Sequence, residues 1–465
     1  MSSDTTTTTE QPGPGDPDRA PSGPPDLPEE SPSLRPGPAG GLGTADPEKP
    51  VEGGTDRRRW PAVREQLRSA GPALLRTSRR RPLLMSLAGF AAFRLLDLLI
   101  VTVVVRRQHP PRPLYAEVGR ALSSWDGRWY LQIIRHGYDW RLQTGPHGIL
   151  RQNALAFFPA YPYLVRWTHH LTRINEVKLG VAISLLTAGA AAVGLTALLR
   201  PLVGPGTALG SSLVWSALPA SAVYGFVYTE GLYAAELVGL LLLLQRRRYL
   251  TMVPLLLVMG LTRGAGIPVA AVLAVHLAQR VRSWSQDRHT HRPQPPRTLA
   301  GPALAFAASV AGALLWPGFI ALRTGEWNAY LKIQQAWVQT ADRAVVPWLT
   351  AVDRLGMPLR QGVLLDVITL VFLGCLVLAV WGMTTRLPLE LRVYLPMYLV
   401  FVLVLLPPYP SFFRYLLPAL TLPVLLVLGV RSWPGRFGLV AMLVVTQYWW
   451  LGLILTQTAA FHVPA

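Results

Sequence analysis

Residues 83–105 read LLMSLAGFAAFRLLDLLIVTVVV, an apolar run near the start of a 465-residue chain. A helix needs about 20 mainly apolar residues to cross the hydrocarbon core of a bilayer, and this run is long enough. Its two charged side chains, Arg94 and Asp97, are three positions apart and therefore share one helix face. Because a lone charge at the bilayer centre costs at least ~3 kcal/mol, we expect an ion pair turned toward other helices. A direct role in substrate binding is the alternative.

The composition extends this conclusion to the whole chain. Hydrophobic residues make up 51% of the sequence and charged residues only 15%, whereas a soluble domain carries about 25% charged residues. The sequence therefore predicts an all-α, polytopic membrane protein with about 11 membrane segments, some of them short or re-entrant. After residues 83–105, we expect segments near residues 177–199, 207–228, 231–245, 250–262, 264–279, 299–322, 364–383, 391–407, 412–430 and 437–459.

The net charge of +19 indicates how the chain is oriented. Most of the excess is arginine in short runs beside apolar segments, a pattern that predicts cytoplasmic loops and contact with lipid headgroups. No basic recognition element stands apart from these flanks, which argues against nucleic-acid binding. We expect a multi-pass protein of the cell membrane with a cytoplasmic N-terminus and with residues 106–176 as the first external loop. Residues 157–167 within that loop are expected to be interfacial or re-entrant, because proline and aromatic residues gather there.

Three regions differ in composition. Residues 1–56 are rich in Pro, Gly, Ser and Thr, which predicts a disordered cytoplasmic tail. Residues 57–82 form a basic juxtamembrane segment, and residues 83–465 are the expected membrane domain. The single cysteine, Cys375, excludes an intrachain disulfide, and its apolar surroundings predict a small residue of the core.

A charged motif follows the first span, at Ser124-Trp125-Asp126-Gly127-Arg128-Trp129-Tyr130. If the motif is helical, Asp126 and Tyr130 share one face, and the neighbouring face carries an apolar stripe that can lie in the membrane interface. The expected stripe is Leu122, Trp125, Trp129 and Ile133. An aspartate at a membrane surface can serve as a general base. The alternative is an anchor helix whose aspartate caps the helix or pairs with Arg128.

Three further charged residues are expected on the same external face. Residues 231–245 and 250–262 are short for a span of about 30 Å, and short helices that end at depth normally line a cavity. This places Glu230 and Arg263 at a common vestibule, where Arg414 is also expected. Recessed arginines suit bidentate binding of a phosphate. The alternative for each arginine is a side chain that reaches the interface and binds nothing specific.

The same residues resemble a known family, the PIG-V-type mannosyltransferases, which are membrane glycosyltransferases of the GT-C fold. The resemblance is carried by Trp125-Asp126-Gly127-Arg128-Trp129-Tyr130 with His136-Gly137-Tyr138, Ala156-Phe157-Phe158-Pro159-Ala160-Tyr161-Pro162, Tyr228-Thr229-Glu230-Gly231-Leu232-Tyr233, Thr262-Arg263-Gly264-Ala265-Gly266 and Phe413-Arg414-Tyr415-Leu416-Leu417-Pro418. These blocks stand in the family's order. Two depart from its pattern: Thr229-Glu230-Gly231 replaces a serine-glutamate-serine stretch, and Gly264-Ala265 replaces a proline-asparagine pair.

The resemblance implies an inverting transfer of mannose from a lipid-phosphate donor outside the cytoplasm, with Asp126 as the base. The Ala-, Arg-, Pro- and Gly-rich composition suits an actinobacterial source, which makes a polyprenyl phosphate the expected carrier. We expect Arg263 and Arg414 to stabilise the leaving phosphate, and Glu230 to orient a sugar hydroxyl or hold an arginine. The full set of expected substrate-binding residues is Trp125, Arg128, Trp129, Tyr130, Tyr138, Glu230, Arg263, Arg414 and Tyr415.

The expected function is thus a hexosyltransferase, most simply a mannosyltransferase, that needs no metal and no cofactor beyond its donor. Its acceptor can be a lipid, a glycan or a protein, and the sequence does not choose among them. A transporter or flippase of a lipid-linked or anionic solute is the main alternative, because charged residues within a membrane also mark transport paths. A non-catalytic membrane scaffold is a third. Transporters often consist of two repeated halves, and no convincing repeat is visible here.

Overall fold

The computed structural model describes residues 81–108, 112–145, 150–264, 266–289, 299–337, 359–405 and 411–457. The chain divides into two units, Met1–Ala62 and Val63–Ala465, and every described residue belongs to the second. The predictions for the tail of residues 1–56 and for most of the basic segment 57–82 therefore fall outside the described residues.

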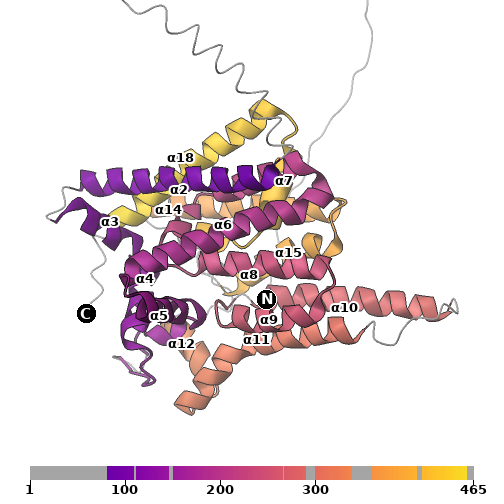
Figure 1. The fold of residues 1–465 in the computed structure, drawn as a ribbon, viewed down its shortest axis with the longest axis horizontal. Helices are drawn as coiled ribbons and strands as arrows, with labels where there is room; N and C mark the ends of the chain where they lie inside the picture. Colours follow the sequence, from indigo (N-terminus) through magenta and orange to yellow (C-terminus); the bar gives the residue numbers. More distant parts are fainter. Residues whose placement is uncertain are drawn as a thin grey trace, which may run out of the picture. The chain divides into compact units, whose positions relative to one another are not determined.

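The described residues are helical and contain no β-strand beyond an isolated bridge between Thr144 and Leu150 (Figure 1). The first half contains α2 Pro82–Arg107, α3 Leu114–Leu122, α4 Asp126–His136, the 3₁₀ turn η2 Ala154–Ala156, α5 Ala160–Thr172, α6 Glu176–Val203, α7 Pro205–Ser216 and the 3₁₀ turn η3 Ser221–Gly225. The second half contains α8 Glu230–Gln245, α9 Tyr249–Gly260, α10 Gly266–His289, α11 Ala300–Thr324, α12 Ala329–Trp337, α14 Leu359–Met383, α15 Leu389–Leu405, α16 Phe412–Tyr415, α17 Thr421–Gly429 and α18 Trp433–Gln457.

Five of the described helices are long and apolar enough to cross a membrane, which indicates an all-α membrane protein. Their membrane-length stretches are Pro82–Arg107, Glu176–Val203, Ala300–Thr324, Asp366–Met383 and Trp433–Thr456. The prediction of a first helix over residues 83–105 is confirmed. Cys375 is buried within α14, as expected for a core residue.

The predicted pair within the first span is present. Arg94 Nη1 lies 3.0 Å from Asp97 Oδ2, and both side chains are buried. Arg94 also donates to the backbone oxygens of Ser216, at 2.6 Å, and Ser221. These carbonyls belong to a break between α7 and η3, so the prediction of one continuous helix over residues 207–228 is wrong. The break is tolerated because a buried guanidinium binds the carbonyls that the interrupted helix leaves unpaired.

A second break separates α16 from α17, where a single segment over residues 412–430 was predicted. Side chains from distant helices again bind the freed carbonyls. Trp215 Nε1 donates to Leu417 O at 3.1 Å, and the hydroxyl of Tyr398 donates to Tyr415 O at 2.7 Å. The break holds α16, which carries Arg414, against α7 and α15.

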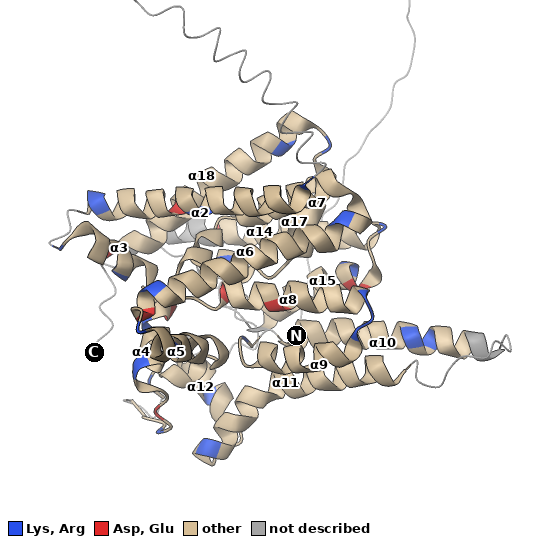
Figure 2. Ribbon diagram, in the orientation of Figure 1, with Lys and Arg blue, Asp and Glu red and all other residues tan. Residues whose placement is uncertain are grey.

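The core lies among helices that are distant in sequence. The helix α6 packs against both α2 and α8, and α9 packs against α11 (Figure 1). The short helices predicted over residues 231–245 and 250–262 are confirmed as α8 and α9. Figure 2 shows acidic residues on α2 and α8 within this bundle, whereas many of the basic residues lie near helix ends. Acidic groups at such positions need a nearby cation or hydrogen-bond donor.

Candidate functional site, an acid–arginine cluster

The site begins at a sharp turn between two short helices. The helix α3 ends at Leu122 and α4 begins at Asp126, so the predicted apolar stripe that joins Leu122 and Trp125 to Trp129 and Ile133 is wrong. Trp125 has φ of 54° and ψ of −121°, and a positive φ is rare for a bulky residue; the chain turns sharply at this position. Asp126 thereby becomes the first residue of α4, where the helix dipole favours a carboxylate. Gly137, with φ of 78°, follows the last residue of α4, a position that favours glycine.

The turn is fastened to the segment that precedes α8. Three hydrogen bonds make the connection: Val227 N to Leu122 O at 2.9 Å, the Tyr228 hydroxyl to Ser124 O at 3.2 Å, and the hydroxyls of Tyr130 and Thr229 to each other at 3.3 Å. This fastening brings the start of α4 next to the start of α8. Two acidic residues far apart in sequence, Asp126 and Glu230, thus lie at neighbouring helix N-termini.

Two arginines complete a group of four charged side chains, here called the acid–arginine cluster: Asp126, Glu230, Arg263 and Arg414. Arg414 Nη1 lies 2.5 Å from Asp126 Oδ2, and its Nε lies 3.3 Å from Glu230 Oε1. Arg263 Nη1 lies 2.8 Å from the same Glu230 oxygen. The four residues come from α4, α8, the α9–α10 turn and α16. All four residues were expected on the external face, and in the structure ion pairs join their side chains.

The side chains of the acid–arginine cluster differ in their exposure to solvent. The side chain of Glu230 is 3% exposed and that of Arg414 is 12% exposed, whereas that of Asp126 is 27% exposed. Glu230 therefore lies beneath the two arginines and bridges them. Asp126 is the most accessible of the four side chains and the one that a substrate can reach most easily.

The partner of Asp126 differs from the one that the alternative prediction named. Arg128 is exposed and takes part in none of the ion pairs found among the described residues, so the alternative of an Asp126–Arg128 pair is not what the structure contains. The guanidinium of Arg414 instead lies 5.2 Å from the ring centre of Tyr228 and 5.5 Å from that of Tyr415. Rings at this range attract a cation and restrict its movement. Tyr415 was expected near a substrate, and its observed contact is with Arg414.

The aromatic residues of the motif have other neighbours. Trp129 stacks on Phe157 with ring centres 5.9 Å apart and meets Trp337 edge-on at 5.2 Å. The Tyr138 hydroxyl donates to Phe157 O at 3.0 Å, and its ring lies 4.9 Å from Trp316. These residues form an aromatic layer built from α4, α11, α12 and the loop before α5. Tyr130 is buried, and burial, with the Asp126 and Glu230 carboxylates nearby, raises its pKa above the ordinary value.

Sequence reasoning missed two groups beside the cluster. Tyr228, two positions before Glu230 in the chain, contributes both a ring that faces Arg414 and a hydrogen bond to the motif. Glu236 is buried within α8, and its Oε1 accepts a 2.8 Å hydrogen bond from Thr262, the neighbour of Arg263. A carboxylate in the apolar run of residues 231–245 was a visible signal for Glu236. Nothing in the sequence indicated the role of the Tyr228 ring.

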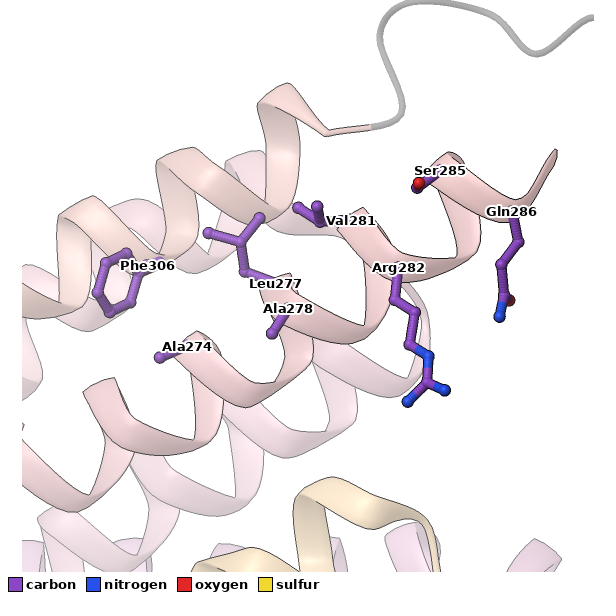
Figure 3. Close-up of a pocket in the computed structure, with 8 residues that line it drawn as sticks. All are labelled: Ala274, Leu277, Ala278, Val281, Arg282, Ser285, Gln286 and Phe306. Atoms are coloured by element: carbon purple, nitrogen blue, oxygen red, sulfur yellow. The ribbon is translucent and has the colours of Figure 1, made fainter. Parts of the chain in front are cut away.

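Other features lie apart from the cluster. A groove of about 590 Å³ runs along α10 and α11, lined by Ala274, Leu277, Ala278, Val281, Arg282, Ser285, Gln286 and Phe306 (Figure 3). None of these residues belongs to the acid–arginine cluster, and the lining is mainly apolar. Across the described part of the chain, no three His, Cys, Asp or Glu side chains are grouped in a way that could hold a metal ion.

The fold and the cluster together define a class: an all-α membrane protein with a half-buried group of two carboxylates and two guanidiniums. A scan of the chain against models of known protein families gives no match, and a search of curated proteins gives none either.

Proposed function

We propose that the protein is an integral membrane glycosyltransferase of the GT-C type, with about 11 membrane segments and a PIG-V-like arrangement of motifs. It transfers mannose or another hexose from a polyprenyl-phosphate sugar to an acceptor hydroxyl on the external face of the cell membrane. One observation carries the proposal: Arg414 contacts Asp126 at 2.5 Å across 288 positions of sequence, and Glu230 joins Arg263 to the same group. A carboxylate that can accept a proton is thus held beside two cations that can bind a phosphate.

The proposed reaction follows from the chemistry of these groups. The Asp126 carboxylate accepts the proton of the acceptor hydroxyl, and the acceptor oxygen forms a bond to the anomeric carbon. The bond from that carbon to the phosphate oxygen breaks on the opposite face, and its electron pair leaves with the lipid phosphate. The configuration of the sugar is inverted. Arg263 and Arg414 stabilise the negative charge that grows on the phosphate.

Glu230 is assigned the role of a positioning residue. Two guanidiniums that approach one phosphate repel each other, and a shared carboxylate oxygen offsets this repulsion. Glu230 Oε1 occupies that position and is nearly inaccessible to solvent, so we favour the earlier prediction that it holds arginines over the prediction that it orients a sugar hydroxyl. Tyr130, which its raised pKa keeps neutral, is a hydrogen-bonding partner of Thr229 and not a second base.

The aromatic residues fit a role in sugar and lipid contact. Trp129 and Tyr138 belong to the aromatic layer beside α4, and aromatic rings of this kind pack against sugar faces and favour the membrane interface. Arg128 is exposed on α4, two positions after Asp126, where it can meet an acceptor or a lipid headgroup. The acceptor itself can be a lipid, a glycan or a protein.

A transfer assay with purified protein in vesicles tests the proposal. The vesicles contain polyprenyl-phosphate mannose and an acceptor extract, and labelled product is counted for the wild type, Asp126→Asn and Asp139→Asn. Because a general base contributes about 100-fold or more, Asp126→Asn should lose transfer by at least that factor. Asp139 is exposed and accepts a hydrogen bond from Arg141 N, outside the cluster, so Asp139→Asn should transfer normally.

Two outcomes would contradict the proposal. Near-normal transfer by a folded Asp126→Asn variant would remove the base from the mechanism. Movement of a lipid-linked sugar or an anionic solute across the vesicle membrane, with no glycosylated product from the wild type, would favour a transporter instead.

A further inference from the structure

Arg414 contacts two carboxylates, and in the proposed reaction it must also bind the donor's phosphate. Its Nη1 is paired with Asp126 and its Nε faces Glu230, while the rings of Tyr228 and Tyr415 restrict its plane. The edge toward Asp126 leads to the most exposed member of the cluster. A phosphate that enters from that side meets the same N–H groups that now bind the base.

We propose that Arg414 serves two partners in turn: it binds the Asp126 carboxylate while that group is ionised, and passes to the donor's phosphate as Asp126 takes up the acceptor's proton. This inference rests on the proposed function and adds a coupling to it. Asp126 and the leaving phosphate compete for Arg414, and transfer of the proton to Asp126 shifts Arg414 to the phosphate.

The charges balance through the step. Before transfer, Asp126 carries one negative charge and the phosphodiester donor carries another. The acceptor's proton neutralises Asp126, and the electron pair of the broken carbon–oxygen bond adds one negative charge to the released phosphate. Negative charge therefore moves from the Asp126 carboxylate to the phosphate. Arg414 dissociates from the neutral Asp126 in the same step in which the phosphate gains its second negative charge.

The second arginine does not exchange in this way. Arg263 is bound at 2.8 Å to Glu230, whose side chain is only 3% exposed and so has no access to an acceptor's proton. The Glu230–Arg263 pair stays ionised and keeps a fixed cation at the phosphate position. The cluster thus contains one permanent pair and one pair that dissociates.

Binding of a short-chain polyprenyl monophosphate tests the coupling, because this probe represents the released phosphate and needs no acceptor. Its dissociation constant is measured with the full-length protein in detergent or nanodiscs, for the wild type, Asp126→Asn, Arg414→Gln and the double variant. Removal of the competing charge should tighten binding to Asp126→Asn by about tenfold or more. The same substitution should change binding by less than about twofold when Arg414 is already replaced, since the shared partner is gone.

Controls make each outcome decisive. Asp139→Asn removes a negative charge outside the cluster and should bind the probe like the wild type. Arg414→Lys replaces Arg414→Gln if the latter does not fold, and should reduce the effect of Asp126→Asn. If Asp126→Asn binds the probe no better than the wild type, the coupling is wrong. The coupling is also wrong if the substitution tightens binding equally in the presence and absence of Arg414. In both cases the transferase proposal stands. If the wild type binds no polyprenyl monophosphate and transfers no sugar, both fail.

Discussion

At the scale of single residues, Arg94 and Asp97 show how a charge is retained inside an apolar bundle. The pair was predictable, because two charges three positions apart in a span can offset each other. The backbone partners of Arg94 were not predictable, because the carbonyls of Ser216 and Ser221 lie more than 100 positions away and come free only where α7 ends. Arg94 therefore stabilises the break between α7 and η3, the region that contains Pro219.

This role predicts a loss of stability. Arg94→Met leaves Asp97 buried without a cation and removes the guanidinium hydrogen bonds to Ser216 O and Ser221 O, so unfolding in detergent should become easier by about 3 kcal/mol or more. Thermal unfolding followed by circular dichroism measures the change. The double variant Arg94→Met, Asp97→Leu removes the stranded carboxylate and should recover part of the loss. Unchanged stability of the single variant would contradict the assigned role.

Glu230 supports a second prediction. In Glu230→Gln the bridging oxygen is neutral, so the two arginines repel each other and neither is held as firmly. Sugar transfer should fall by about tenfold or more, because small displacements of positioning groups are costly, while the protein stays folded. The matched control is Glu117→Gln, which replaces an acid on α3 that pairs with Arg120 outside the cluster and whose side chain is 14% exposed. Equal transfer by both variants would contradict a positioning role for Glu230.

Sequence reasoning found all four residues of the acid–arginine cluster but not their pairing. Charged residues in apolar surroundings are conspicuous, and their position beside predicted external ends suggested one vestibule. Which arginine binds which carboxylate depends on the turn at Trp125 and on the breaks around α16, and neither follows from helical periodicity. The pair of Asp126 with Arg414 was therefore visible only in the fold.

At the scale of elements, short and interrupted helices build the site. The short lengths of α8 and α9 were predicted, because their apolar runs are bounded by Glu230 and Arg263. The interruptions at residues 217–220 and 416–420 were not predicted, although each contains a proline, Pro219 and Pro418, which is a visible signal for a break in a helix. Side chains from other helices, among them Trp215 and Tyr398, bind the freed carbonyls and so make the breaks stable.

The start of α8 is tightly packed, which predicts an effect of adding one methyl group. A Cβ on Gly231 would lie 2.4 Å from Ser184 O, so Gly231→Ala must shift the N-terminus of α8 and Glu230 with it. Transfer should fall by about tenfold or more. A Cβ on Gly239 in the same helix would meet Leu255 at an ordinary 3.7 Å, so Gly239→Ala should transfer normally. The prediction fails if the two variants have the same activity.

The contact between α9 and α11 is equally close. A Cβ on Gly260 would lie 2.0 Å from Gly312 O, whereas nothing lies within 4 Å of a Cβ on Gly318 of α11. Gly260→Ala should therefore lower the unfolding temperature clearly, and Gly318→Ala should leave it unchanged or raise it slightly through better helix propensity. Thermal unfolding of the two variants in detergent gives the comparison. Equal unfolding temperatures would mean that the helices can separate without cost.

At the scale of the whole molecule, α8 separates two differently charged ends. The acid–arginine cluster lies at its first residue, and Arg246, Arg247 and Arg248 follow its last. A 16-residue helix is about 24 Å long, so these groups lie near opposite sides of a bilayer if α8 crosses it. The positive-inside rule then predicts a cytoplasmic arginine run and an external cluster.

Cysteine labelling tests this orientation. In a Cys375→Ala background, Asp139→Cys and Arg247→Cys each introduce one exposed thiol. A membrane-impermeant maleimide added to intact cells should label position 139 and should label position 247 only after the membrane is opened. The reverse pattern would contradict the predicted topology, and labelling of both in intact cells would contradict a membrane-crossing arrangement between them.

The most direct test of the central claim is an experimental structure of the full-length protein with a polyprenyl-phosphate sugar bound. We expect density for the phosphate within hydrogen-bonding distance of Arg263 and Arg414, with Asp126 released from Arg414 or turned toward the acceptor side of the sugar. A phosphate bound elsewhere, such as in the groove along α10 and α11, with the Asp126–Arg414 pair intact, would contradict it.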